Sequence, residues 1–448
     1  MKDIADAMIK GSRMSLIYSI ILFGITLFPI LRNGICYSST LEYIHIAMSF
    51  ICSIALFSNQ NKPYSLYKVF HLFFLFFFCI APILQYKNQV MLLDTLFVER
   101  EYIETSVVLL LVLILFNVGY FVSYKQIKIH RRKSRKIDQT IENKRTIYLL
   151  LIISIAICVF NFYLNNFNIM SLLVREDVFK SRVEMNQIAD LVIDKLLRPM
   201  PMILFLSSLI YKTERWVKCL FAMSFFLTTP FTGMPRNAAA AMYIPVLLWC
   251  VPFFQRKNVF ILTLTLGLLV VFPFLNNFRV LTSINDISFD LNFDQFEDLN
   301  FDSYSMFMRV ISGNVITNGY QFLGVLLFWV PRSLWTSKPM GSGFYVAETT
   351  HLSFNNISMP YFGEGYINWG YLGVVLFAIV LAYVLAKLDK KYWTYTHYQG
   401  KTINKIKYFM LLGLLMFILR GDLLSSFAYT IGYMVSFEIT KRIVQGKQ

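Results

Sequence analysis

The chain has 448 residues, of which 56% are apolar and only 15% are charged, and its formal net charge is +16. A soluble chain carries about 45–50% apolar and about 25% charged residues, so this composition excludes an ordinary soluble protein. Apolar runs of about 18 residues, enough to cross a bilayer, recur along the whole sequence. They predict one all-α polytopic membrane domain over residues 1–448. The cysteines stand singly and mostly in apolar runs, which indicates neither a zinc site nor a disulfide framework.

About twelve segments in chain order are predicted to cross the membrane. They are 14–31, 41–58, 67–85, 106–124, 147–164, 199–211, 216–232, 237–254, 258–275, 370–386, 408–420 and 422–438. The first lacks a small-residue cleavage site, so we expect a retained span and no removed signal peptide. The last two are so close together that they predict a tight hairpin. A further apolar run, GYQFLGVLLFWV, is too short to span and predicts a re-entrant or interfacial helix.

Lys and Arg residues gather in the loops on one side of this predicted topology. That side includes both termini, the basic loop 125–146 with its run KQIKIHRRKSRK, and even the QRK turn at 255–257. Because basic loops stay in the cytoplasm, we expect both termini to be cytoplasmic. The basic run then anchors the topology at an anionic leaflet, and no nucleic-acid partner is expected. The main outer loops are 165–198 and 276–369.

The late outer loop contains an unusual segment, FWVPRSLWTSKPMGSG, which places Arg332 and Lys338 among aromatics, prolines and glycines. Further arginines border apolar segments on the same side: Arg236, Arg279, Arg309 and Arg420. A charge beside a span costs several kcal/mol unless it is paired or wet, so each could be a snorkelling anchor. As a set, they indicate a site for phosphate or pyrophosphate on a lipid, because arginine binds phosphate oxygens bidentately.

Glu364 and His351 are the candidates for a general base on the outer side. Glu364 lies between glycines in YFGEGYINWGYLG, and His351 is the only histidine expected in an outer loop. Either could instead be an ordinary polar loop residue, and Asp422 is close enough in the chain to pair with Arg420. Nearby aromatics suit either sugar faces or the interfacial belt: Trp329, Trp335, Tyr345, Tyr361, Tyr366 and Trp369. No nucleotide-binding or metal-binding motif occurs, so we expect no cofactor, no metal and a pre-activated substrate.

Four segments resemble motifs of the bacterial oligosaccharide repeat-unit polymerases, the Wzy-type polymerases of O-antigen and related surface glycans. They are TGMPRNAAAAM, PRSLWTSKPMGSG, GEGYINWGYLGVVL and RGDLLSSFAYTIG, which occur in the family's order between residues 230 and 440. Arg332 and Gly343 also stand at the Arg-x10-Gly spacing of some family members. The N-terminal half contains no motif that can be assigned.

The resemblance implies a fold like that of membrane glycosyltransferases and O-antigen ligases. It also implies an enzyme of the bacterial cytoplasmic (inner) membrane that joins repeat units linked to undecaprenyl pyrophosphate. By this analogy Arg332 and Lys338, then Arg236 and Arg420, with Arg309 and Arg279, would bind the leaving pyrophosphate. Glu364 would be the base, with His351 second. A chain-length regulator and a flippase would be pathway partners.

Two other functions remain open at this stage. A flippase for lipid-linked oligosaccharides would typically show two pseudo-symmetric halves, short loops and charges near mid-span. This chain has one dominant late loop and few charges within its predicted spans. An O-antigen ligase is an enzyme of similar design, and a capsule or exopolysaccharide polymerase uses the same chemistry.

Overall fold

The computed structural model describes residues 2–58, 62–129, 144–168, 187–210, 213–231, 234, 236–268, 293–355, 357–399 and 402–445, and within them it contains helices and connecting segments but no strand. Six helices in this part are long and apolar enough to cross a membrane. They are Met14–Leu31, Ser39–Phe57, Leu66–Lys87, Glu99–Gln126, Arg145–Leu164 and Tyr361–Thr394. The predicted all-helical polytopic fold is therefore confirmed, whereas the predicted number of twelve spans is not.

One enclosed rod runs through the N-terminal part of the chain, and helices from the C-terminal part pack on it together with the second helix. The N-terminal part comprises α1 (Lys2–Leu31), α2 (Ser39–Phe57), the continuous α3 (Leu66–Phe74), η1 (Leu75–Ile80) and α4 (Ala81–Lys87), the short η2 (Leu92–Asp94), and α5 (Glu99–Gln126). The 66–87 rod is buried over its whole length, because aromatic residues cover every side of it. In contrast, α1 leaves large apolar side chains exposed, such as Leu16, Ile20 and Phe28, as a lipid-facing helix does.

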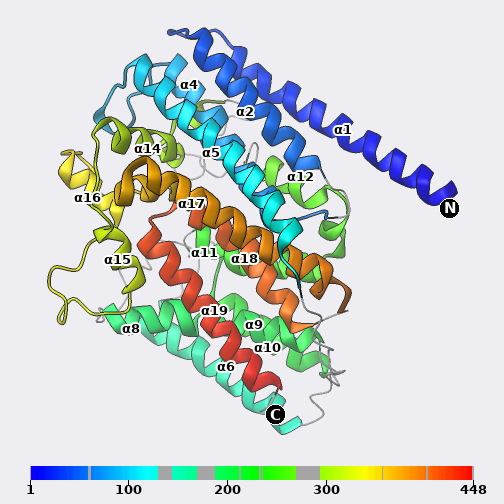
Figure 1. The fold of residues 1–448 in the computed structure, drawn as a ribbon. Coiled ribbons are helices and arrows are strands. Elements are labelled where there is room, and N and C mark those ends of the chain that lie inside the picture. Colours follow the sequence, from blue (N-terminus) through cyan, green and yellow to red (C-terminus); the bar gives the residue numbers. More distant parts are fainter. Residues whose placement is uncertain are drawn as a thin grey trace, which may run out of the picture.

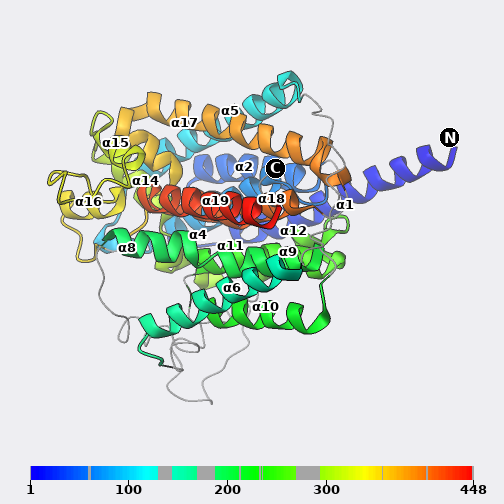
Figure 2. The ribbon, with the colours of Figure 1, turned by 90° about the horizontal axis from the view of Figure 1, so that it is seen from below.

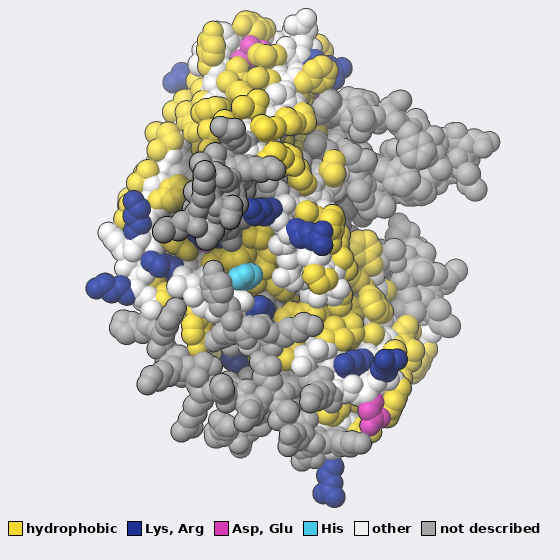
Figure 3. All heavy atoms as spheres, turned by 90° about the vertical axis from the view of Figure 1, so that its right-hand side faces the viewer, with side chains coloured by type: hydrophobic (Ala, Val, Ile, Leu, Met, Phe, Trp, Pro, Cys, Tyr) yellow, Lys and Arg dark blue, Asp and Glu magenta, His cyan; other side chains and the backbone are white. Residues whose placement is uncertain are grey.

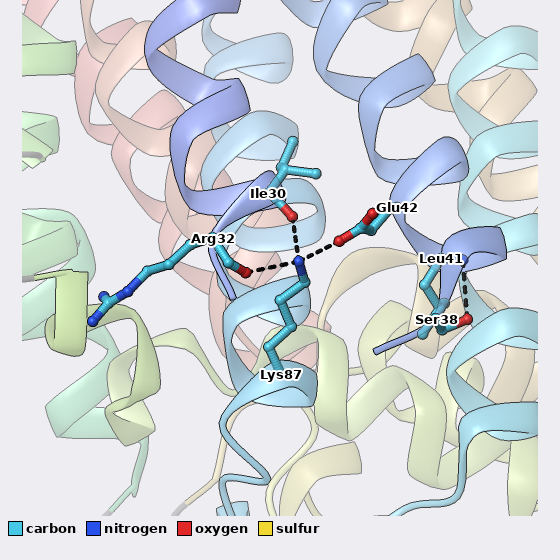
Figure 4. A network of polar contacts seen from close by, with 6 residues as sticks. All are labelled: Ile30, Arg32, Ser38, Leu41, Glu42 and Lys87. Atoms are coloured by element: carbon cyan, nitrogen blue, oxygen red, sulfur yellow. Dashed lines mark hydrogen bonds and ion pairs between the residues drawn. The ribbon is translucent and has the colours of Figure 1, made fainter. Parts of the chain in front are cut away.

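Lys87 joins the end of this rod to the α1–α2 connection (Figure 4). Its Nζ donates to the carbonyl oxygens of Ile30, at 2.7 Å, and Arg32, at 2.9 Å, and it forms an ion pair with Glu42. Figure 4 shows that only the backbone of Arg32 takes part, since its side chain points away. A lysine that is only 3% exposed needs such partners, so this network is structural.

A second core lies in the middle of the chain. The helices of this part are α6 (Lys144–Leu164), α8 (Gln187–Val192) with η4 (Ile193–Leu197), α9 (Met200–Ile210), α10 (Arg215–Thr228), α11 (Arg236–Cys250), η5 (Pro252–Gln255) and α12 (Val259–Leu266). The core itself is formed by α6, α9, α10 and α11 with residues of 403–414 and 433–444, whereas Phe260 and Ile261 of α12 belong to the first core. Helices α6, α9 and α10 pack against one another, and α11 packs along α18 (Ile403–Arg420). Gly413 of α18 makes the last crossing close, because a Cβ there would lie 2.4 Å from the Ala240 carbonyl oxygen.

The C-terminal part carries the short helices of the late loop and two long hairpin helices. It comprises η8 (Phe293–Glu297), η9 (Leu299–Phe301), α14 (Ser303–Ser312), α15 (Tyr320–Leu326), α16 (Ser342–Thr349), α17 (Tyr361–Thr394), η10 (Thr396–Gln399), α18 (Ile403–Arg420) and α19 (Leu423–Gln445). Helix α15 is the short helix expected within GYQFLGVLLFWV, and α18 and α19 form the predicted tight hairpin.

The short helices and the chain termini lie at opposite ends of the molecule. Figures 1 and 2 both place α14, α15 and α16 at one end, here called the loop end, and both termini toward the other, the terminal end. Figure 3 faces the terminal end: Lys and Arg side chains are scattered over it, and few Asp or Glu side chains are visible.

Helix α17 is sharply kinked near the loop end. Trp369 has φ −147° and ψ 28°, and Gly370 has φ 60° and ψ −147°, a conformation that only glycine adopts readily. The kink brings Gly365 against Gly373. A Cβ added to Gly373 would lie 1.9 Å from the Gly365 carbonyl oxygen. The glycines of GEGYINWGYLG are thus required by a short helical segment, 361–368, that folds back from the long helix.

Candidate functional site

Residues 328–343, hereafter the cationic loop, are held together by their own two cations. The Arg332 Nη1 donates to the Lys338 carbonyl oxygen at 2.6 Å, and its Nη2 donates to that of Pro339 at 3.2 Å. The Lys338 Nζ donates to the carbonyl oxygens of Phe328, at 2.7 Å, and Val330, at 2.8 Å. The predicted pair of cations is therefore brought together in one closed loop.

The two cations differ in the number of N–H donors that remain available to a ligand. Arg332 is half-buried and uses two of the roughly five N–H donors of a guanidinium in these bonds. Lys338 is only 4% exposed. Burial lowers the pKa of the Lys338 ammonium, and the nearby positive charge of Arg332 lowers it further. Arg332 is thus the cation of this loop with more donors left for a ligand.

Two carboxylates fix the end of the cationic loop. The Ser342 hydroxyl donates to Glu364 Oε2 at 2.8 Å, and the Gly343 N–H donates to Asp422 Oδ2 at 3.0 Å. Glycine is required here, because a Cβ on Gly341 would lie 2.4 Å from Asp422 Oδ2. Glu364, on the folded-back segment of α17, and Asp422, between α18 and α19, therefore hold the start of α16.

The same carboxylates accept from the first turn of α19. Leu423 N–H donates to Glu364 Oε1 at 2.8 Å, and Leu424 N–H donates to Asp422 Oδ1 at 3.2 Å. A helix N-terminus offers unpaired N–H groups and a partial positive charge, so it suits a carboxylate. Glu364 is fully buried with both oxygens occupied, while Asp422 is partly buried.

The folded-back segment of α17 also fixes the start of α15. Thr317 N–H donates to the Ile367 carbonyl oxygen at 2.7 Å, and Gly319 N–H donates to that of Asn368 at 2.9 Å. The Asn368 side chain accepts from Phe322 N–H at 2.8 Å and donates to the Glu364 carbonyl oxygen at 2.8 Å. One segment thus positions both α15 and the end of the cationic loop.

A cleft of about 370 Å³ lies between these two positioned parts. Its lining comes from the start of α15, the end of the cationic loop and α16: Thr317, Tyr320, Gln321, Pro339, Met340, Phe344, Tyr345 and Glu348. Pro339 connects the cleft to the cations, because its carbonyl oxygen accepts from Arg332 and its ring packs beside Gly324 of α15. The volume of the cleft and its combination of polar and apolar lining residues are typical of a small-molecule site.

Arg309 and Arg420 are engaged away from the cationic loop. Arg309 is 7% exposed and donates to the Leu93 carbonyl oxygen, at 3.0 Å, and to Thr95 Oγ1, at 2.7 Å. The Arg420 Nη2 contacts Asp302 Oδ1 at 3.4 Å. The alternative pairing of Asp422 with Arg420 does not form, because the Asp422 side chain accepts from Gly343 N–H and Arg420 contacts Asp302.

The remaining predicted residues are less defined or lie apart. His351 is exposed just beyond α16, with a left-handed φ of 55°. Arg236 is the first residue of α11, but its side chain is outside the described part of the chain. Arg279 lies outside the described residues. Within the described residues, no group of three or more His, Cys, Asp or Glu is placed to hold a metal ion.

Sequence reasoning missed two polar residues of the cleft, Gln321 and Glu348. Neither belongs to a recognisable motif, and Gln321 lies inside the run GYQFLGVLLFWV, which was interpreted only as a short helix. One feature of the sequence could have identified Glu348: it lies three residues before His351, in the same predicted outer segment.

The model of the O-antigen polysaccharide polymerase Wzy family matches residues 14–440, nearly the whole chain. Comparison with curated proteins gives no match, and comparison with solved structures gives none either. The family match includes the cationic loop, the kinked segment of α17 and the α18–α19 turn that surround the cleft. The chain belongs to the O-antigen polysaccharide polymerase Wzy family, whose members polymerise lipid-linked oligosaccharide repeat units.

Proposed function

We propose that this polymerase joins undecaprenyl-pyrophosphate-linked repeat units into O-antigen or a related surface polysaccharide at the outer face of a bacterial cytoplasmic membrane. The loop end then faces outward, and both termini are cytoplasmic. Support for this orientation comes from the basic surface of the terminal end (Figure 3), because positively charged loops remain in the cytoplasm.

In the proposed reaction, a hydroxyl of the acceptor sugar attacks the anomeric carbon of the donor glycan. A new C–O bond forms, the bond from that carbon to the phosphate oxygen breaks, and undecaprenyl pyrophosphate leaves with the bonding electron pair. The hydroxyl proton passes to a base. Fixed cations lower the barrier because negative charge develops on the leaving group.

The observation that carries this proposal is the clamped cationic loop beside the cleft. Arg332 is already oriented by two carbonyl oxygens, and it keeps further N–H groups for pyrophosphate oxygens. Its charge therefore needs little reorganisation when the ligand arrives. Lys338 adds a second positive charge within the same loop.

The other sequence-based assignments stay part of this proposal. Arg420, Arg236, Arg309 and Arg279 are further candidates for contacts to the pyrophosphate, and Glu364 and His351 are the candidates for the base. A metal-independent reaction fits the use of arginine for charge stabilisation. A flippase and a chain-length regulator would supply units and set product length.

The test compares the surface glycan of a deletion strain with that of the strain carrying wild-type protein. Loss of a polymerase leaves single repeat units on the cell surface, whereas loss of a flippase leaves lipid-linked units inside and no surface glycan. Loss of a ligase leaves long glycan on the undecaprenyl carrier. We expect single units in the deletion strain and a restored ladder with wild type; either of the other two patterns would overturn the proposal.

A further inference from the structure

The cleft has a lining unlike that of a phosphate site. Among the described residues that line it, Glu348 is the only charged one, and no Lys or Arg contributes. An anionic headgroup would meet a carboxylate here without a cation to offset it. The cleft therefore suits an uncharged, hydroxyl-rich ligand better than pyrophosphate.

Gln321 contributes an amide to the residues that line the cleft. The residue is only 4% exposed, yet it lines the cavity and makes no side-chain hydrogen bond to any residue that the structure describes. Its amide atoms are not fully enclosed, so a ligand or water in the cleft can satisfy them. An amide can both donate to and accept from sugar hydroxyls.

Glu348 has the position and freedom that a base requires. It lies in the last turn of α16, its side chain is exposed, and it has no ion-pair or hydrogen-bond partner among the described residues. The start of α16 is held by Glu364 and Asp422, so Glu348 projects from a fixed helix. In contrast, both oxygens of Glu364 are already occupied.

Aromatic rings complete the walls of the cleft. Tyr320 comes from α15, and Phe344 and Tyr345 come from α16. The Tyr320 hydroxyl donates to the Ser337 carbonyl oxygen, and its ring packs edge-on against Trp335 at 6.3 Å, which fixes this wall. A pyranose ring presents C–H groups on its faces, and these bury well against such rings.

We propose that this cleft binds the terminal sugar of the acceptor repeat unit and that Glu348 is the general base for its attacking hydroxyl. This inference rests on the proposed function. Gln321 orders the sugar hydroxyls, and the aromatic rings cover the sugar face. The hydroxyl proton moves to the Glu348 carboxylate as the oxygen bonds to the donor anomeric carbon, and undecaprenyl pyrophosphate departs on the side of Arg332.

The test uses purified protein in lipid nanodiscs with undecaprenyl-pyrophosphate-linked single units isolated from the deletion strain. Glu348→Gln should lower kcat roughly 100- to 10,000-fold, as loss of a general base does, with KM for the unit little changed. Tyr345→Ala should mainly raise the KM for the unit. The control is Glu99→Gln, an exposed acid at the start of α5 that does not line the cleft.

The outcomes separate this inference from the function on which it rests. If wild type fails to extend the units at all, the proposed function is wrong. If wild type extends them and both Glu348→Gln and Gln321→Ala keep wild-type kcat and KM, the acceptor cleft is wrong while the polymerase assignment stands. If Glu348→Gln is inactive and melts below wild type, Glu348→Asp decides: partial activity at the wild-type melting temperature supports the base, and full wild-type activity overturns it.

Discussion

Asp389 and the Glu364–Asp422 pair, two of the buried carboxylate centres in the described part of the chain, are used differently. Asp389, near the terminal end of α17, is fully buried and accepts from the N–H groups of Leu66 and Tyr67, at 3.0 and 3.1 Å. It also accepts from the hydroxyls of Tyr120 and Tyr408. All four donors belong to packed helices, so this centre joins α3, α5, α17 and α18 into one core.

The Glu364–Asp422 centre lies near the opposite end of the same helix and uses the same device, a carboxylate at a helix N-terminus. Its donors belong to α19 and to the start of α16, which follows the cationic loop. The first centre holds helices to helices, whereas the second holds a functional loop to the helical frame. The role of a buried carboxylate therefore depends on whether its hydrogen-bond donors lie in packed helices or beside a functional loop.

The largest expected effect is on stability, at Asp389. Asp389→Ala leaves four buried donors without their acceptor, at about 1–3 kcal/mol for each unsatisfied group. We expect little folded protein, measured as the monodisperse fraction in detergent, and Asp389→Asn should be intermediate. A well-folded Asp389→Ala protein would contradict a structural role for this centre.

The second comparison separates positioning from proton transfer at Glu364. Glu364→Ala should lower activity roughly 100-fold, because a displacement of about 1 Å at an active site has such an effect. Glu364→Gln should stay close to wild type, since its amide oxygen can accept from Leu423 N–H and its amino group can donate to Ser342. Initial polymerisation rates measure both variants. If Gln is as damaging as Ala, Glu364 serves as the base predicted from the sequence.

A smaller effect is expected from the kink that places Glu364. Gly370→Ala forces a side chain into φ 60° and ψ −147°, at a cost of about 1–3 kcal/mol. The melting temperature in detergent should fall. Gly24→Ala is the matched control, because no atom lies within 4 Å of the added Cβ and alanine favours the helix. Equal melting temperatures for the two variants would show that alanine at position 370 adopts the kinked conformation without a cost.

The sequence predicted the helical membrane fold and identified Arg332 and Lys338 as the two cations of one stiff loop. Hydropathy and charge are local properties, so they can be read directly from the chain. It did not predict that Asp422 would contact Gly343 or that Gln321 and Glu348 would share a cleft. Those contacts join residues far apart in sequence, and the kink at Gly370, which places Glu364, has no pattern in hydropathy. The only feature of the sequence that indicated this kink was the set of glycines in GEGYINWGYLG.

The central claim is that the cationic loop stabilises the leaving pyrophosphate, and the most direct measurement is the polymerisation rate of purified Arg332→Ala protein. We expect a fall of roughly 100- to 1,000-fold, the usual effect of removing one preorganised charge-stabilising donor, with the melting temperature close to wild type. A rate equal to that of wild type would contradict the account and make Arg332 a structural anchor of its loop.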